Sequence, residues 1–354
     1  MRSSHMDITS HCWYQDAMSS LTKEANAMMH DATTLAGARI LVTGGTGFIG
    51  SRLLTRLCEM DAHVHAVSRE QQPEMPSNVE WYQGDLADLP TARSLMEAVK
   101  PDVIYHLAGH VVGGRGSEAI VPTFHCNLAG TVNLLTAAQS IGCNRCILSG
   151  SLEEPSVDAG EGVPSSPYAV TKWASSAYAR MFHALYQFPA VILRVFMVYG
   201  PGQRDLNKLI PYVIASFLRG DTPELSSGRR AIDWIYVDDV VDAFLAAALA
   251  VNIEGKTLDV GSGKTETVRG VVQTIARLLA QDEAPVFGSR PDRPLEQVRV
   301  ADPRAAEKFL RWTPQVSLEE GLQRTIDWYA RHLGASAGDC AVAVNDEHST
   351  EEEG

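Results

Sequence analysis

Short runs of apolar residues alternate with longer segments in which apolar residues recur every three or four positions, up to about residue 194. The runs are short and rich in branched side chains and therefore predict buried strands, whereas the periodic segments predict amphipathic helices. The strands are expected at 40–42, 63–67, 79–82, 103–107, 145–148 and 190–194, and the helices at 51–60, 89–98, 120–140 and 168–186. Such alternation is typical of a parallel sheet with helices on both faces.

The pattern becomes irregular after residue 198. Helices are expected there at 209–218, 237–250, 268–279, 303–309 and 318–331, and short strands at 232–235 and 257–260. We interpret residues 195–333 as mainly a substrate-binding lobe that closes over the carboxyl edge of the sheet, where ligands bind in such folds. Residues 37–194 would form the main domain, after an N-terminal extension (1–36) that begins like a cloning tag and before a disordered acidic tail (334–354).

A glycine-rich turn, Gly-Gly-Thr-Gly-Phe-Ile-Gly at 44–50, joins the first expected strand to the first expected helix. Glycine lets the backbone approach a pyrophosphate, and the N-terminus of the helix offers N–H groups and the positive end of its dipole. The order strand, turn, helix predicts a dinucleotide site formed by Gly44, Thr46, Gly47, Phe48, Ile49 and Gly50. We therefore expect an α/β fold, a Rossmann-type doubly wound parallel sheet with a smaller C-terminal α/β substrate lobe.

Composition narrows the functional class. The chain has 354 residues, 45% hydrophobic and 21% charged, which suits a globular enzyme. Its formal charge of −13 argues against nucleic-acid and anionic-membrane partners. With no apolar stretch long enough to span a bilayer and no signal peptide, a cytoplasmic location is expected. Cys143 and Cys146 have C-x-x-C spacing but no second pair, so we expect core residues there and no metal site.

The end of the second expected strand selects the cofactor. Arginine there accommodates the 2′-phosphate of NADP, whereas an acidic residue selects NAD. Ser68 and Arg69 favour NADP, and Glu70 keeps NAD open as the alternative. Asp85 is placed to accept from the adenine amino group. Further dinucleotide contacts are expected from residues after the third and fourth strands, Asp85, Leu86, Leu107, Ala108 and Gly109.

Candidate chemistry lies in the next unit. Tyr168 and Lys172 are four residues apart, so they share one face of the expected helix. The ammonium is expected to lower the pKa of the phenol, so that Tyr168 exchanges a proton near neutral pH, and Lys172 has donors to spare for the nicotinamide ribose. Ser151, just after the fifth strand, would hydrogen-bond the substrate oxygen on the carbon that loses or gains the hydride.

These motifs resemble the extended short-chain dehydrogenase/reductase family, in its NAD(P)-dependent nucleotide-sugar epimerase, dehydratase and reductase group. The resemblance spans about residues 37–332. It is carried by the glycine turn, Gly84-Asp-Leu86, His106-Leu-Ala-Gly109, Asn127-Leu-Ala-Gly-Thr131, Tyr168 with Lys172, residues 194–202 and Tyr236-Val-Asp-Asp239. It implies a catalytic triad of Ser151, Tyr168 and Lys172, with Phe196 also at the cofactor. It further implies a nucleotide-diphosphate hexose as substrate and a homodimer paired through helices 120–140 and 168–186.

Departures from the family pattern refine the activity. Glu153 stands where 4,6-dehydratases have a base for the C5 proton, but Leu152 replaces the residue that acts as an acid. Glu153 is therefore a candidate catalytic base, with a substrate hydrogen-bond acceptor or a solvated loop carboxylate as alternatives. Met197 replaces a common diphosphate-binding Asn. Further substrate contacts are expected from His110, Ser151, Met197, Arg230 and Arg293, the arginines because their planar forks bind two oxygens at once.

Three hypotheses follow. The first is an NADP-dependent 4-ketoreductase of a nucleotide-diphosphate 4-keto-6-deoxyhexose in deoxysugar biosynthesis, favoured by Arg69 and Leu152. The second is a 4,6-dehydratase or an epimerase that retains its cofactor between turnovers. The third is a non-catalytic dinucleotide-binding regulator, against which the intact set of Ser151, Tyr168 and Lys172 argues.

Overall fold

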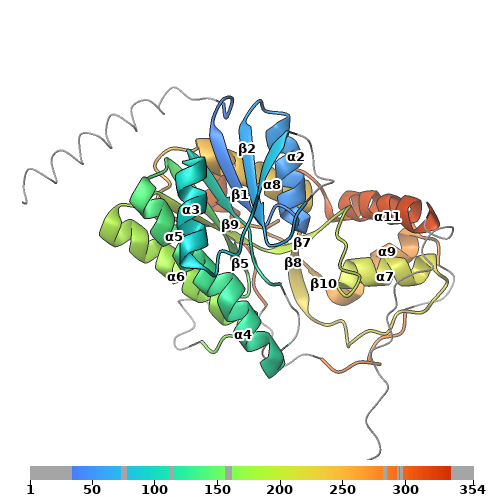
Figure 1. Cartoon of the computed structure of the whole chain (residues 1–354). Coiled ribbons are helices and arrows are strands. Elements are labelled where there is room, and N and C mark those ends of the chain that lie inside the picture. The colour runs from blue at the N-terminus through green and yellow to red at the C-terminus, as the bar shows by residue number, and fades with distance from the viewer. Residues whose placement is uncertain are drawn as a thin grey trace, which may run out of the picture.

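The computed structural model describes residues 34–72, 78–111, 115–155, 162–281, 285–292, 295 and 298–335 (Figure 1). Most of the N-terminal extension, almost all of the acidic tail and Arg293 lie outside the described residues. What the sequence predicts for them stays a prediction.

The large sheet of the described chain has seven strands in the order β3-β2-β1-β4-β5-β6-β9. All of its pairings are parallel. Its strands are β1 (Arg39–Thr43), β2 (His63–Ser68), β3 (Val79–Gln83), β4 (Val103–His106), β5 (Arg145–Ser151), β6 (Ala190–Val195) and β9 (Thr257–Val260). The order reverses between β1 and β4, which opens a crevice at the carboxyl ends of these strands. The predicted doubly wound α/β sheet is confirmed.

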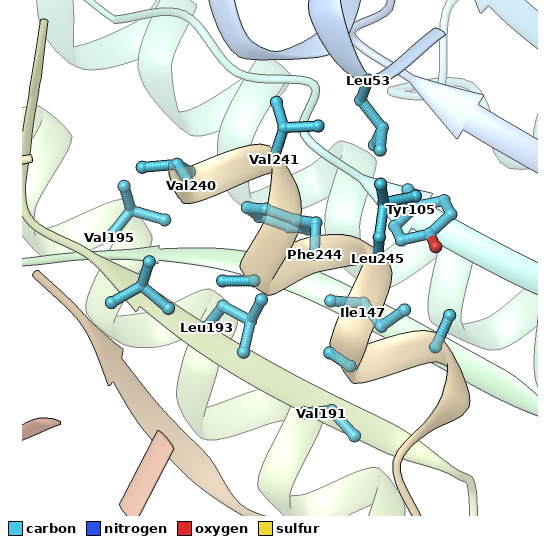
Figure 2. Packing of buried hydrophobic residues seen from close by; sticks show 14 of the residues in the cluster. Leu53, Tyr105, Ile147, Val191, Leu193, Val195, Val240, Val241, Phe244 and Leu245 are labelled. Carbon is cyan, nitrogen blue, oxygen red and sulfur yellow. The ribbon is translucent and has the colours of Figure 1, made fainter. Parts of the chain in front are cut away.

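Helices cover both faces of this sheet (Figure 1). One face carries α2 (Phe48–Cys58), α8 (Val237–Leu249) and α10 (Pro303–Leu310), and the other carries α3 (Leu89–Val99), α5 (Gly130–Ile141) and α6 (Pro167–Tyr186). Leu53 of α2 and Phe244 of α8 are fully buried. Figure 2 shows α8 laying Val240, Val241 and Phe244 over the sheet beside Leu193. Burial of these apolar faces fixes the layers around the carboxyl-end crevice.

The helix expected at 120–140 is present, and it contains a π-helical segment. It consists of a 3₁₀ turn (Ser117–Ala119), a short α4 (Ile120–Thr123), the π-helix η2 (Phe124–Ala129) and then α5. The π-turn coincides with Asn127, whose 2%-exposed side chain bonds to the main chain of His110 and the hydroxyl of Thr171. A π-turn inserts one residue into the helical period, so apolar spacing alone did not reveal this change of helix type.

A smaller lobe lies beside the carboxyl edge of the large sheet (Figure 1). Its three-stranded sheet, in the order β10-β8-β7, consists of β7 (Met197–Tyr199), β8 (Ala231–Tyr236) and β10 (Thr265–Thr267). Helices α7 (Leu209–Leu218), α9 (Val268–Leu278) and α11 (Leu318–Ala335) pack on it. Strands β7 and β10 were not predicted because three residues are too short to show a period. The chain returns to the large sheet through α8 and β9, so the lobe joins it at several points.

Candidate active site

The glycine turn is shaped by close backbone packing. Gly44 has φ +74°, and a Cβ there would lie 2.6 Å from the Ala108 main-chain nitrogen. A Cβ on Gly50 would overlap the Gly44 carbonyl oxygen. Helix α2 begins within this turn at Phe48, and its N-cap residue, Gly47, makes no side-chain capping hydrogen bond. Its first N–H groups are therefore available to phosphate oxygens, as a dinucleotide site requires.

The residues expected at the adenosine end follow β2 and β3. Ser68 ends β2 and donates its hydroxyl to the Glu70 carbonyl. Arg69 is exposed, and its Nη1 lies 3.8 Å from the Cys126 sulfur in η2. Asp85 is also exposed, and its carboxylate accepts from the Ala87 main-chain N–H at 2.9 Å. Both ionic groups lie at the surface, just after the carboxyl ends of the neighbouring strands β2 and β3, and their roles toward a cofactor stay predictions.

The remaining predicted cofactor residues are spread between surface and core. Thr46 is exposed, and Ile49 is half-buried. Leu86 and Phe196 are buried, Phe196 with 3% exposure, so Phe196 presents little side-chain surface to a ligand. Leu107, Ala108 and Gly109 form the exit from β4 and pass over the glycine turn.

Ser151, Tyr168 and Lys172 come together at the end of β5. Ser151 is the last residue of that strand, not a loop residue after it, and is 7% exposed. Tyr168 lies in the first turn of α6, whose N-cap Ser166 accepts from the Ala169 N–H at 3.1 Å. The Tyr168 and Ser151 side chains are hydrogen-bonded. The Lys172 Nζ donates to the Ser149 carbonyl at 2.7 Å.

The electrostatics of this cluster differ from the expectation for Tyr168. Burial raises the pKa of Tyr168 well above its usual value, against the lowering effect of the bond with Ser151, and Glu153 and Glu154 raise it further. The prediction that Lys172 brings this pKa close to neutrality is therefore wrong in this structure, because desolvation and two carboxylates raise the pKa. Burial also lowers the pKa of Lys172 to about 8, and Glu154 opposes that change. Tyr168 is therefore a protonated phenol in this structure, hydrogen-bonded to Ser151.

Glu153 and Leu152 occupy different surroundings. The Glu153 Oε2 atom accepts from the Ser166 hydroxyl at 3.3 Å, and its main-chain N–H donates to the Ser151 hydroxyl at 3.2 Å. Leu152 is 6% exposed and packs in the core between the sheet and α8. Glu153 is half-buried beside the cluster. The carboxylate of Glu153 is accessible enough to transfer a proton, whereas Leu152 is buried in the core and has no acidic group.

Several polar residues at the site were not assigned a role from the sequence. The hydroxyls of Thr43 and Thr131 hold the two ring nitrogens of buried His106 at 2.7 and 2.8 Å. Burial lowers the pKa of His106 to about 3, with a smaller effect from Lys172. Glu154, which adjoins Glu153, is only 1% exposed. The sequence motifs that contain His106 and Asn127 indicated that these residues lie near the cofactor site. The sequence around Glu154 gave no sign that this glutamate is buried and not a surface carboxylate.

The expected substrate residues come from several elements. His110 is held after β4, its main-chain N–H donating to Asn127 Oδ1 at 2.6 Å. Met197 is half-buried in β7, and Arg230 is half-buried directly before β8. The Arg230 carbonyl accepts from the Val268 N–H at 2.9 Å, which fixes the backbone there. Their roles toward substrate stay predictions.

The described cysteines, Cys58, Cys126, Cys143 and Cys146, are all free. Cys146 is buried in β5, as expected of a core residue. Among the described residues, no group of metal-ligating side chains is arranged to hold an ion. Within the same part of the chain, no helix combines the length and the apolar character that crossing a membrane requires.

Comparison with known proteins was made for sequence and for structure. The profile of the NAD dependent epimerase/dehydratase family matches residues 40–261. A UDP-glucose 4-epimerase of Mycolicibacterium smegmatis is 31% identical over 314 residues, which is 82% of this chain and 98% of that protein. A dTDP-glucose 4,6-dehydratase of Haemophilus influenzae is 28% identical over 341 residues, 84% of this chain and 99% of the relative.

The fold is likewise similar to solved structures. A UDP-glucuronic acid 4-epimerase from Bacillus cereus, in complex with UDP-glucuronic acid and NAD, superposes with a TM-score of 0.72 at 28% identity. The match covers 83% of this chain and 99% of the other. Both lobes of the described chain therefore have a counterpart in proteins of one family.

Proposed function

The chain belongs to the NAD dependent epimerase/dehydratase family, and from this premise we propose that it transfers a hydride between a nicotinamide dinucleotide and C4 of a hexose carried on a nucleoside diphosphate. It is an enzyme of the extended short-chain dehydrogenase/reductase type that uses a nicotinamide dinucleotide. The observation that carries the proposal is the convergence of Ser151, Tyr168 and Lys172 at the carboxyl end of β5, next to the glycine turn. That edge is where a doubly wound sheet binds its ligands.

The residues present fit such a cofactor. The uncapped N-terminus of α2 and the tight turn at Gly44 leave room and donors for a pyrophosphate. Lys172 lies near Gly109, with its Nζ 3.8 Å from the position of a Cβ there, so the β4 exit loop and the ammonium border the same space. When bound, the nicotinamide supplies or accepts the hydride.

We propose net reduction of a 4-keto sugar as the main activity, that is, a 4-ketoreductase of a nucleotide-diphosphate 4-keto-6-deoxyhexose. Ser151 would orient the sugar carbonyl, and Tyr168 would deliver its proton to that oxygen as the hydride arrives at C4. The hydrogen bond between Tyr168 and Ser151 supports this assignment, because it brings the two side chains to one place. Lys172 would then stabilise the phenolate that remains, because its ammonium lies on the same face of α6.

Two observations bear on the competing activities. Leu152 is buried in the core, so no acid is available from that position to expel a 6-hydroxyl, which argues against 4,6-dehydration. Similarity to a UDP-glucose 4-epimerase favours epimerisation as the second candidate function. In an epimerase Tyr168 would take the proton of the 4-hydroxyl and return it within one turnover, while the bound nicotinamide would take up and return the C4 hydride. Glu153 would serve as a base in a dehydratase and as a hydrogen-bond acceptor for substrate in a reductase.

We further propose NADP as the preferred cofactor and a homodimer as the assembly. Arg69 is exposed directly after β2, where its guanidinium would meet a 2′-phosphate. Phe124 is 48% exposed and Trp173 is 42% exposed, on elements that pack together. An apolar surface of this kind is typical of a protein interface. A cytoplasmic location is part of the same proposal.

Two measurements on the purified protein test the activity. A reductase is expected to oxidise one NADPH for each 4-keto sugar converted and to bind the dinucleotide exchangeably. Full occupancy by a co-purified dinucleotide, with sugar conversion but no net NADPH oxidation, would instead establish the epimerase. Formation of a 4-keto-6-deoxy product from the plain nucleotide hexose would establish a dehydratase and overturn the argument from Leu152.

A further inference from the structure

Glu154 is a buried carboxylate at the centre of the active-site architecture. Its side chain is 1% exposed, and its Oε1 accepts from two donors, the Ser151 main-chain N–H at 2.8 Å and the Ser176 hydroxyl at 3.0 Å. Burying an ionised carboxylate is costly unless it is hydrogen-bonded or paired with a charge. The two bonds and the nearby Lys172 ammonium meet that requirement together.

The position of Ser176 connects Glu154 to the predicted catalytic residues. Tyr168, Lys172 and Ser176 follow one another at intervals of four along α6, so they form one stripe on the helix. Glu154 bonds to the third member of this stripe and, with the same oxygen, to the backbone of Ser151 on β5. It therefore fixes the end of β5 against the face of α6 that carries Tyr168.

The surrounding backbone is arranged for this side chain. A Cβ at Gly150 would lie 2.7 Å from the Glu154 Oε1, so the glycine leaves the space that the carboxylate fills. The main chain of Glu154 is also held, because the Arg299 Nη1 donates to the Glu154 carbonyl at 2.9 Å. Glu154 is thus held at both its main chain and its side chain.

Charge gives Glu154 a second effect. The groups that interact electrostatically with Lys172 are Glu154 and His106, and Tyr168 lies one turn away on α6. His106 is uncharged at neutral pH because burial lowers its pKa to about 3. Among the described residues, Glu154 is thus the carboxylate whose field raises the pKa of Lys172 against the effect of burial.

We propose that Glu154 is a positioning residue for this active site: its carboxylate, bonded to the Ser151 main-chain N–H and the Ser176 hydroxyl, locks the end of β5 to the face of α6 that carries Tyr168 and Lys172. The inference rests on the proposed function for its catalytic meaning, but the effect on Lys172 is measurable without turnover. The stretch Leu152-Glu153-Glu154 therefore contains two carboxylates with different roles. Glu153 lies beside the catalytic cluster, and the buried Glu154 supports it by bonding to β5 and α6.

The decisive variant is Glu154→Gln. The amide oxygen keeps both hydrogen bonds while the charge is lost, so the pKa of Lys172 is expected to fall by about one unit. Nuclear magnetic resonance of the protein labelled with ¹³C at lysine Cε follows this titration without substrate or cofactor, and Lys172→Met assigns the signal. Glu153→Gln is the matched control, expected to leave the Lys172 titration in place.

Two further variants separate geometry from charge. Glu154→Asp keeps the charge but shortens the side chain, so we expect a titration near that of the wild type and a kcat about tenfold lower. Ser176→Ala removes one bond and leaves the charge, and it should lower kcat without moving the Lys172 titration. Both remain informative if Glu154→Gln does not fold.

An unchanged Lys172 titration in Glu154→Gln, or an equal shift in Glu153→Gln, would overturn the electrostatic part of the proposal. Wild-type kcat in both Glu154→Asp and Ser176→Ala would overturn the positioning part. A wild-type protein that turns over no nucleotide sugar would refute the proposed function instead, and the titration result would still stand.

Discussion

The Lys172 ammonium donates to the carbonyl oxygen of Ser149 at 2.7 Å, and this bond ties helix α6 to the last residues of strand β5. It places a cation beside the strand end that carries Ser151, with Tyr168 one turn earlier on the same helix. The distances between these groups depend on how α6 packs on the sheet, because strand and helix are separate segments of the chain. The predictions below test that arrangement and the binding surfaces around it.

Replacing Tyr168 with Phe removes the proton donor while keeping the ring. We expect kcat to fall by about 10²- to 10⁴-fold, the usual contribution of a positioned acid or base, with dinucleotide affinity little changed. Steady-state kinetics and a binding titration measure the two quantities. Tyr186→Phe, at the exposed end of the same helix, is the control and should behave as the wild type. Survival of full activity in Tyr168→Phe would contradict the catalytic role.

Replacing Gly44 with Ala should abolish dinucleotide binding. The new Cβ would lie 2.6 Å from the Ala108 nitrogen, in addition to the strain of φ +74°. Gly37 has φ +71° but nothing within 4 Å of a Cβ, so Gly37→Ala isolates the conformational cost. That cost is about 1–2 kcal/mol, and we expect Gly37→Ala to keep dinucleotide binding. Equal stability and binding in the two variants, measured by denaturant unfolding and titration, would be inconsistent with the close approach.

Stability should fall on acidification because of His106. The unfolded histidine takes up a proton near its usual pKa of 6.5, whereas the buried side chain does so only at about 3. Between these values the unfolded state binds more protons, so unfolding becomes easier as the pH drops, by up to about 1.4 kcal/mol per pH unit. Urea unfolding between pH 4 and 7 measures this slope.

The matched variants separate this histidine from the others. His106→Gln, although less stable at neutral pH, should show a shallower slope. Replacement of exposed His125 by Gln should keep the slope of the wild type. A slope that is identical in the wild type and in His106→Gln would assign the acid sensitivity to other groups.

Arg69→Ala should weaken NADPH binding selectively. Loss of a guanidinium contact to the 2′-phosphate is expected to raise the KM for NADPH about tenfold and to leave that for NADH nearly unchanged. Arg219→Ala, whose exposed ion pair with Asp221 lies in the smaller lobe, is the charge-matched control. If both cofactors respond equally to Arg69→Ala, or if the wild type prefers NADH, the proposed NADP preference is wrong.

Trp173→Glu should convert a dimer into a monomer. The side chain is 42% exposed in the single chain, so the substitution spares the core but places a charge in the proposed interface. Sedimentation or light scattering measures the mass, and circular dichroism checks the fold. Val251→Glu, also at an exposed apolar position but after α8, should leave the dimer intact. A wild-type protein that is monomeric at high micromolar concentration would refute the interface.

The order of helices and strands could be predicted from the sequence because the type of each element depends on the local spacing of its apolar residues. Leu53 of α2 is fully buried, as the helical spacing of apolar residues required, and the alternation of strand and helix gave the doubly wound sheet. The glycine turn, with its strand and helix, indicated the dinucleotide edge. The spacing of Tyr168 and Lys172 placed both on one helix face, since a period of 3.6 brings residues four apart together.

Tertiary structure decided what depends on burial and on contacts between distant segments. The π-turn at Asn127 exists where its amide meets His110 and Thr171, partners that a helical period does not report. The raised pKa of Tyr168 follows from desolvation at the sheet edge, whereas the four-residue spacing suggested the opposite direction. Glu153 and Glu154 are identical neighbours in the sequence, yet only Glu154 is buried, because the end of β5 turns it toward Ser176 of α6. Sequence periodicity determined the layers, and the packing of those layers determined each site residue's electrostatic environment.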